Sequence, residues 1–121
     1  MSLTRRRQSY NGLFKLTVKR VQNSFDYLCG VFDGEGSFGV WSKGKDKSPA
    51  FRMQVEMADG DVVLRFLQHF KVGSITIRVP KEDNHKVMYH WRVNGDEAKN
   101  IVRSMLPLLS KRRQEQFHKA A

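Results

Sequence analysis

The fold of this chain is indicated most clearly by residues 28–38, which read Leu-Cys-Gly-Val-Phe-Asp-Gly-Glu-Gly-Ser-Phe. Ser24, just upstream, can cap a helix. The apolar side chains of that helix recur at helical spacing: Phe25, Leu28, Val31 and Phe32. Because Gly34 and Gly36 permit a sharp exit, we predict a helix over residues 24–34 that leads directly into a strand.

Four later segments alternate apolar and polar residues, which is the period of a half-buried strand. These segments are residues 37–43, 50–58, 74–79 and 86–93. The first two flank the turn Gly44–Pro49 and are expected to form a hairpin.

Two amphipathic helices complete the pattern. One begins at Asp59 or Asp61 and stops at Gly73. The other begins at Asn94 or Asp96, is broken at Pro107, and is followed by a basic helical segment over residues 108–119. The order αββαββα predicts an α+β domain with a four-stranded, mainly antiparallel sheet, helices on one side and the other face bare.

The bare face of the predicted sheet is polar and basic. Its outward residues are Ser37, Trp41, Lys43, Arg52, Gln54, Glu56, Thr76, Arg78, Lys86, His90 and Arg92. Such side chains bond base edges and phosphates, although an ordinary solvated face would also be polar. We therefore predict that this face contacts nucleic acid.

Charge and length agree with that interpretation. The 121 residues fit one domain, and a formal net charge of +10 indicates a polyanionic partner. Nucleic acid is favoured, while a ribosomal protein or a binder of anionic surfaces would carry a similar charge. Residues 1–22 are expected to be a basic arm or a solvated tail, and residues 23–121 the single folded domain.

Cysteine usage and hydropathy limit the location. The single cysteine, Cys29, rules out an internal disulfide and fits a reducing compartment. No apolar run is long enough to span a bilayer, and no secretory signal is recognised. We expect an intracellular protein with no membrane partner, in a bacterium, a phage-infected cell or an organelle.

Residues 28–36 resemble the nine-residue motif of the LAGLIDADG homing endonucleases, and Ser37 and Phe38 match the Ser-Phe that often follows it. The similarity extends to the element order, to Phe70-Lys71-Val72-Gly73-Ser74-Ile75 and to Leu106-Pro107-Leu108-Leu109-Ser110-Lys111-Arg112. It covers about four fifths of the chain. The resemblance implies a sequence-specific, metal-dependent DNA endonuclease that is typically intron-encoded.

The resemblance also implies a site for catalysis. The eighth motif position, more often Asp in the family, is Glu35 here, and with the Gly34 carbonyl it would hold Mg²⁺ or another divalent cation. A glutamine and a lysine usually complete the family's site. Gln54 or Glu56 is the candidate on the second strand, and near the family's lysine the chain reads Asp96-Glu97-Ala98-Lys99.

A single motif implies a homodimer, because family members with one copy pair two subunits. The expected interface residues are Tyr27, Leu28, Cys29, Gly30, Val31, Asp33 and Gly34. Small residues at Cys29 and Gly30 would let two helices approach closely. Asp33 is expected to bond backbone donors rather than a metal.

The paired subunits would sit as a saddle on double-stranded DNA. The two sheets would follow the major groove of a pseudo-palindromic site. Basic residues of the last helix would contact phosphates: Lys111, Arg112 and Arg113. The product would be a staggered double-strand break.

Three alternatives remain open from the sequence. The same fold could serve a non-catalytic DNA-binding regulator, although a regulator needs no acid at Glu35. It could also serve an RNA maturase whose partner is intron RNA. A ribosomal or anionic-surface binder would explain the charge but leaves residues 28–38 unexplained.

Overall fold

The structure, a computed structural model, describes residues 25–42, 48–82 and 85–120. The predicted basic arm and Lys43 lie outside these residues. The described elements are α2 (Phe25–Glu35), β1 (Gly36–Trp41), β2 (Ala50–Met57), α3 (Gly60–Phe70), β3 (Ser74–Arg78), β4 (Met88–Asn94), α4 (Gly95–Met105), the 3-10 turn η1 (Leu106–Leu108) and α5 (Lys111–Ala120).

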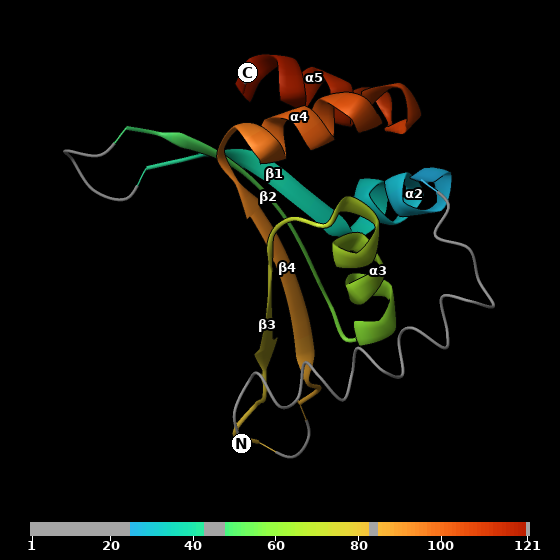
Figure 1. The fold of residues 1–121 in the computed structure, drawn as a ribbon, viewed down its shortest axis with the longest axis vertical. Coiled ribbons are helices and arrows are strands. Elements are labelled where there is room, and N and C mark those ends of the chain that lie inside the picture. The colour runs from blue at the N-terminus through green and yellow to red at the C-terminus, as the bar shows by residue number, and fades with distance from the viewer. Residues whose placement is uncertain (1–24, 43–47, 83–84, 121) are drawn as a thin grey trace.

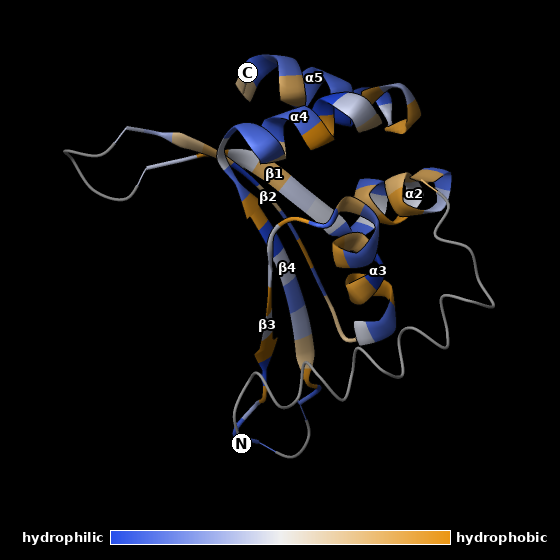
Figure 2. Ribbon diagram, in the orientation of Figure 1, coloured by the Kyte–Doolittle hydropathy of each residue, from blue (hydrophilic) through white to orange (hydrophobic). Residues whose placement is uncertain are grey.

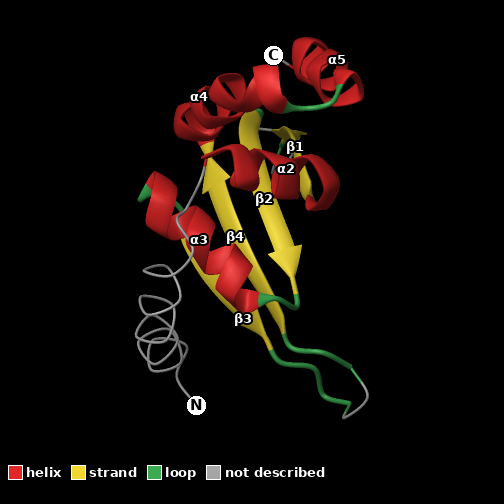
Figure 3. Ribbon diagram, turned by 90° about the vertical axis from the view of Figure 1, so that its right-hand side faces the viewer, coloured by secondary structure: helices red, strands yellow, loops and turns green. Residues whose placement is uncertain are grey.

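The four strands form one sheet in the order β1-β2-β4-β3, with every neighbouring pair antiparallel. The helices lie on one side of the sheet, and no described helix covers the other side (Figures 1 and 3). The predicted α+β architecture with one bare sheet face is therefore confirmed.

The core lies between the sheet and the helices, where Trp91 of β4 is fully buried. Its indole stacks at 5.1 Å from Phe66 and 5.8 Å from Phe70, and its Nε1–H donates to the Val72 carbonyl at 3.0 Å. Gly73 has φ +94°, and a Cβ there would lie 2.6 Å from the Arg92 carbonyl oxygen. This close approach requires glycine and holds the start of β3 against β4.

Figure 2 shows how hydrophilic and hydrophobic residues are distributed over the sheet and the helices. Along α5, whose sequence is KRRQEQFHKA, hydrophilic colour predominates, with Phe117 buried on its inner side. None of the described helices is both long and apolar enough to cross a membrane.

Some element ends differ from the predicted ones. Helix α3 ends at Phe70. The capping residue is Lys71, which takes a left-handed conformation (φ 59°) and donates its N–H to the Leu67 carbonyl, so Gly73 is needed for the close packing instead. Val79 lies beyond β3 and is 49% exposed, and Lys86 precedes β4. Helix α5 starts at Lys111, because residues 106–108 form a separate 3-10 turn.

Candidate nucleic-acid interface and acidic site

Glu35 is the last residue of α2 and stands where the helix meets the sheet. Gly36 then starts β1, and a Cβ on it would lie 2.2 Å from the Phe32 ring, so only glycine allows this tight exit. Gly36 pairs with Val55 and Ser37 with Gln54, which puts this end of β1 beside the middle of β2. Glu35 is exposed, and its carboxylate has no hydrogen-bond or ion-pair partner among the described residues.

Asp33 has a structural role two residues earlier. Its Oδ1 accepts the Ser110 backbone N–H at 2.9 Å, just before α5 begins. That bond holds the pKa of the Asp33 carboxyl below its usual value, with help from the positive charges of Arg113 and Arg112. The prediction that Asp33 bonds backbone donors is confirmed. The carboxylate is turned to α5 of its own chain and is half-buried, and its place in the dimer interface stays a prediction.

Arg113 was expected to contact phosphate, and the structure corrects this. The residue is only 7% exposed. Its guanidinium donates to the Gly36 carbonyl at 2.5 Å and to the Asp33 carbonyl at 3.3 Å, and lies 5.7 Å from the Phe38 ring. Arg113 therefore binds the backbone on both sides of Glu35 to α5, while its neighbour Arg112 is exposed.

The expected dimer residues divide into two groups. Leu28 and Cys29 are fully buried in their own subunit, so neither can form an interface, which corrects their assignment. Burial, with the nearby charge of Asp26, raises the pKa of the Cys29 thiol to about 11, and the residue is a core side chain. Val31 is half-buried and packs against the core.

The other group lies on the opposite side of α2. Tyr27 is 41% exposed, and Gly30 and Gly34 are exposed too. Their spacing of three and four residues places them on one helix face. A Cβ built on either glycine would meet nothing within 4 Å, so this face has room for a closely packed neighbour.

A buried arginine lies beside this face and was missed by the sequence reasoning. Arg65 of α3 is 7% exposed, and its guanidinium carbon lies 5.3 Å from the Tyr27 ring centroid. Its Nε has no hydrogen-bond partner in the described part of the chain. The only sequence signal is its place between the buried residues Leu64 and Phe66.

The bare sheet face brings most of its predicted residues together in cross-strand rows. Gln54 of β2 is paired with Ser37 on one side and Arg92 on the other, and Arg92 is paired with Ser74 of β3. In the next row Glu56 is paired with His90, and His90 with Thr76.

Side-chain bonds connect these rows. Arg52 Nε donates to Asn94 Oδ1 at 3.0 Å, and its guanidinium lies 5.3 Å from the Trp41 ring. His90 Nε2 bonds Gln54 Oε1 at 2.9 Å. Glu56 forms an ion pair with Arg78.

The imidazole of His90 is half-buried. Partial burial lowers the pKa of its imidazole below the usual value, and the positive charge of Arg92 lowers it further, against an opposing contribution from Glu56. Because a carboxamide oxygen can only accept, the His90 ring donates its Nε2–H to Gln54 Oε1.

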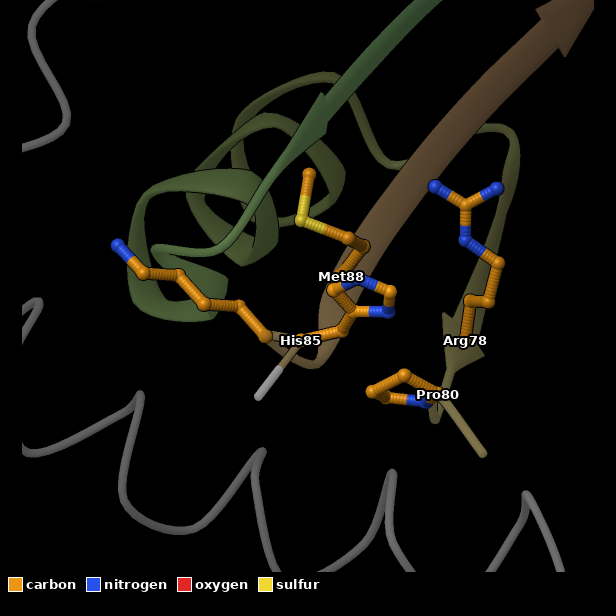
Figure 4. Close-up of a pocket in the computed structure, with 5 residues that line it drawn as sticks. Arg78, Pro80, His85 and Met88 are labelled. Atoms are coloured by element: carbon orange, nitrogen blue, oxygen red, sulfur yellow. The ribbon is translucent and has the colours of Figure 1, made fainter. Parts of the chain in front are cut away.

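The outer end of β3 and β4 holds a cavity of about 310 Å³. Its lining residues are Arg78, Pro80, His85, Lys86 and Met88. Figure 4 shows the Arg78 and Pro80 side chains on one side of it, and His85 and Met88 on the other. Lys86, expected on the strand face, thus lies at this edge.

Lys99 is not brought to Glu35. It lines a different cavity with Val40 and Asp96, at the end of β1 remote from α2. The positive charges on this side of the molecule are those of Arg113, which bonds the carbonyls of Asp33 and Gly36, and of Arg112, which acts on Asp33. Within residues 25–42, 48–82 and 85–120, no group of three His, Cys, Asp or Glu side chains is placed to hold a metal ion.

Comparison with known proteins bears on the fold. No family sequence model and no curated protein sequence matches this chain. Among solved structures, it is similar to the homing endonuclease I-CvuI in complex with its target (17% identity, TM-score 0.59, 76% of this chain and 60% of that one). It is also similar to the homing endonuclease I-TnaI (20% identity, TM-score 0.58, 78% of this chain and 66% of that one). A third similar structure is the LAGLIDADG meganuclease I-AabMI bound to uncleaved DNA (23% identity, TM-score 0.58, 78% of this chain and 33% of that one).

At these identities the likeness establishes the fold. The chain has the fold of the LAGLIDADG homing endonucleases, as residues 28–38 predict, and it spans about 60% of the length of I-CvuI.

Proposed function

We propose that the chain is a LAGLIDADG-type homing endonuclease. Two copies bind a long, pseudo-palindromic site in double-stranded DNA and hydrolyse one phosphodiester on each strand, which leaves a staggered break. The observation that carries this proposal is Glu35, an exposed carboxylate with no partner among the described residues, at the junction of α2 with a basic sheet face.

An unpaired acid in this position weakens the binding of DNA by a protein that does nothing else. The bare face carries Arg52, Arg78 and Arg92, which attract phosphates, whereas an unpaired carboxylate beside it repels them. A regulator that only binds DNA gains nothing from it. A hydrolase gains a ligand for a divalent cation, and this favours the catalytic interpretation.

The groups present fit Mg²⁺ or another hard divalent cation. Glu35 and the Gly34 carbonyl offer only oxygen atoms, the ligands these ions prefer, and Mg²⁺ keeps several waters so that few protein ligands suffice. One copy supplies one carboxylate, so a site with two acids needs two copies. When bound, the cation would supply an activated water and neutralise charge on the leaving oxygen.

The chain's own residues position the duplex and the acid. Arg113 and Asp33 fasten the end of α2 to α5, which fixes the backbone on both sides of Glu35. Arg112 is exposed near this point, and its charge can stabilise a phosphate. Gln54, the expected second catalytic residue, is oriented by its bond to His90.

The dimer forms, in this proposal, through the exposed face of α2. Gly30 and Gly34 leave room for a second helix to approach, and Tyr27 extends the contact towards the N-terminal end. The two sheets then form a continuous saddle on the DNA, with Lys111 and Arg112 of each copy at the phosphates. Intron RNA is the alternative ligand for the same surface.

The test is cleavage of a library of randomised duplexes by the purified protein with Mg²⁺, followed by sequencing of the cut ends. Glu35→Gln should lose cleavage and keep its DNA affinity, because it removes the charge that a hard cation needs and leaves the arginines intact. Glu115→Gln is the matched control, since Glu115 is an exposed acid on α5, and it should cleave as the wild type does.

Two outcomes would contradict the proposal. Equal cleavage by the wild type and Glu35→Gln would remove Glu35 from the site. Tight binding of a selected duplex by the wild type without any cleavage would favour the non-catalytic regulator, and tighter binding of intron RNA than of duplex DNA would favour the maturase.

A further inference from the structure

We infer that the side-chain groups left free at the centre of the bare sheet face, on Arg92 and Gln54, are hydrogen-bond donors, and that each half of the DNA site consequently carries guanine at the positions these residues meet. This inference rests on the proposed function, since it assumes that the face enters a DNA groove. It adds which bases the protein selects, which no resemblance of fold specifies.

Three side-chain oxygens of the face already accept hydrogen bonds within the sheet. Asn94 Oδ1 accepts from Arg52 at 3.0 Å. Gln54 Oε1 accepts from His90 at 2.9 Å. The carboxylate of Glu56 is paired with Arg78. In each case one side-chain oxygen accepts a hydrogen bond from a donor on another strand of the sheet.

Other donors of the face, by contrast, are not used within the sheet. Arg92 lies in the middle of the face, between Gln54 of β2 and Ser74 of β3. Its Nε is buried and has no hydrogen-bond partner in the described part of the chain, so its terminal nitrogens are the donors that a base can meet. Gln54 keeps both hydrogens of its amide nitrogen, and Arg52 has a guanidinium edge beyond the nitrogen that bonds Asn94.

Base edges differ in how they meet such a surface. In the major groove guanine offers two acceptors, O6 and N7, whereas adenine offers an acceptor beside an amino donor and cytosine offers an amino donor. An arginine can bond both guanine acceptors at once. Gln54 cannot make the two-bond contact with adenine, because that contact needs the oxygen already bonded to His90.

The experiment separates base preference from binding. The full chain is mixed with randomised duplexes in EDTA, so that no strand is cut, and the bound fraction is sequenced. Guanine should be enriched at matching positions of the two half-sites. Changing one such guanine should weaken binding about 5- to 150-fold, since a good two-bond contact is worth roughly 1–3 kcal/mol.

Modified bases test which DNA groove the protein reads and whether the base accepts the hydrogen bond from the protein. Replacing a selected guanine with 7-deazaguanine removes the N7 acceptor and keeps base pairing, and should weaken binding at least about fivefold. Inosine removes only the minor-groove amino group and should leave the affinity unchanged.

Protein variants assign the contact. Arg92→Ala should abolish the preference at one position per half-site, whereas Arg103→Ala, an exposed arginine of α4 on the helical side, should preserve it. Arg78→Ala frees the Glu56 carboxylate and should raise the tolerance for cytosine at the position nearest to it.

Several results would overturn the inference. Selection of adenine or cytosine at these positions, equal affinity for 7-deazaguanine and guanine, or binding without base preference would each refute it while leaving DNA binding intact. Failure to bind any duplex would refute both this inference and the proposed function.

Discussion

Replacing Arg113 with methionine is expected to destabilise the domain strongly, whereas the same change at its neighbour Arg112 is not. Arg113 is 7% exposed and donates to the Gly36 carbonyl at 2.5 Å and the Asp33 carbonyl at 3.3 Å. Arg112 is exposed and forms no hydrogen bond with the described residues. The two positions thus give a matched pair on one helix.

The expected loss in the free energy of unfolding follows from these contacts. A hydrogen bond from a charged donor contributes roughly 1.5–3 kcal/mol, and a cation over an aromatic ring roughly 0.5–2 kcal/mol. The bond to Asp33 is long, so the Gly36 bond and the Phe38 ring contact dominate. Methionine keeps the aliphatic packing, so we expect a loss of about 3 kcal/mol. For a domain of this size that is a fall in Tm of about 12 °C.

The assay is thermal and urea unfolding of Arg113→Met, Arg113→Lys and Arg112→Met, with circular dichroism as the signal for unfolding. Arg113→Lys should be intermediate, since an ammonium can still bond one carbonyl. Well below its Tm, Arg113→Met should also cleave DNA with a lower kcat and little change in affinity, because the backbone flanking Glu35 is no longer fixed. Equal Tm values for Arg113→Met and Arg112→Met would refute the reasoning.

Three further changes test other parts of the molecule. Gly30→Leu should fill the open face of α2 and give monomers with little specific binding, and sedimentation that finds wild-type monomers on DNA at micromolar concentration would contradict this. Asp33→Ala should cost about 1 kcal/mol near neutral pH by removing the acceptor for the Ser110 N–H. Because the pKa of Asp33 is lowered in the folded state, this contribution is complete above the ordinary Asp pKa and disappears as the pH falls through the lowered value, which urea unfolding against pH would reveal. Lys111→Ala should weaken binding to all duplexes alike and reduce the salt slope by about one unit, as measured by titrations at several salt concentrations.

The strands and the outward face could be predicted because a sheet covered on one side imposes a period of two on its sequence. Alternation from Phe51 to Met57 placed Arg52, Gln54 and Glu56 on the outer face, and the register of β2 with β4 confirms that they share it with Arg92. The pattern weakens at strand ends. Val40 continues the alternation and is nevertheless 46% exposed, since it lies near the outer end of the hairpin.

The orientation of α2 could be predicted only in part. Small residues occur at both Cys29 and Gly30, and composition does not say which of them faces the core. Packing resolves this, because Cys29 is fully buried while Gly30 is exposed. The two buried arginines, Arg65 and Arg113, were beyond sequence reasoning for another reason. Charged residues are assigned to the surface by default, and the partners of Arg113 lie 77 and 80 residues away in the chain.

If the proposed dimer forms through α2, dimerisation and catalysis should be lost together. Gly30 and Glu35 are five residues apart on one helix, which is a rise of about 7.5 Å. Helices in contact have axes about 8–10 Å apart, so a partner helix packed at Gly30 and Gly34 would bring its own Glu35 close to the first. A change that only widens the helix contact, such as Gly30→Leu, should therefore abolish double-strand cleavage even though it leaves every acid and arginine of the subunit in place.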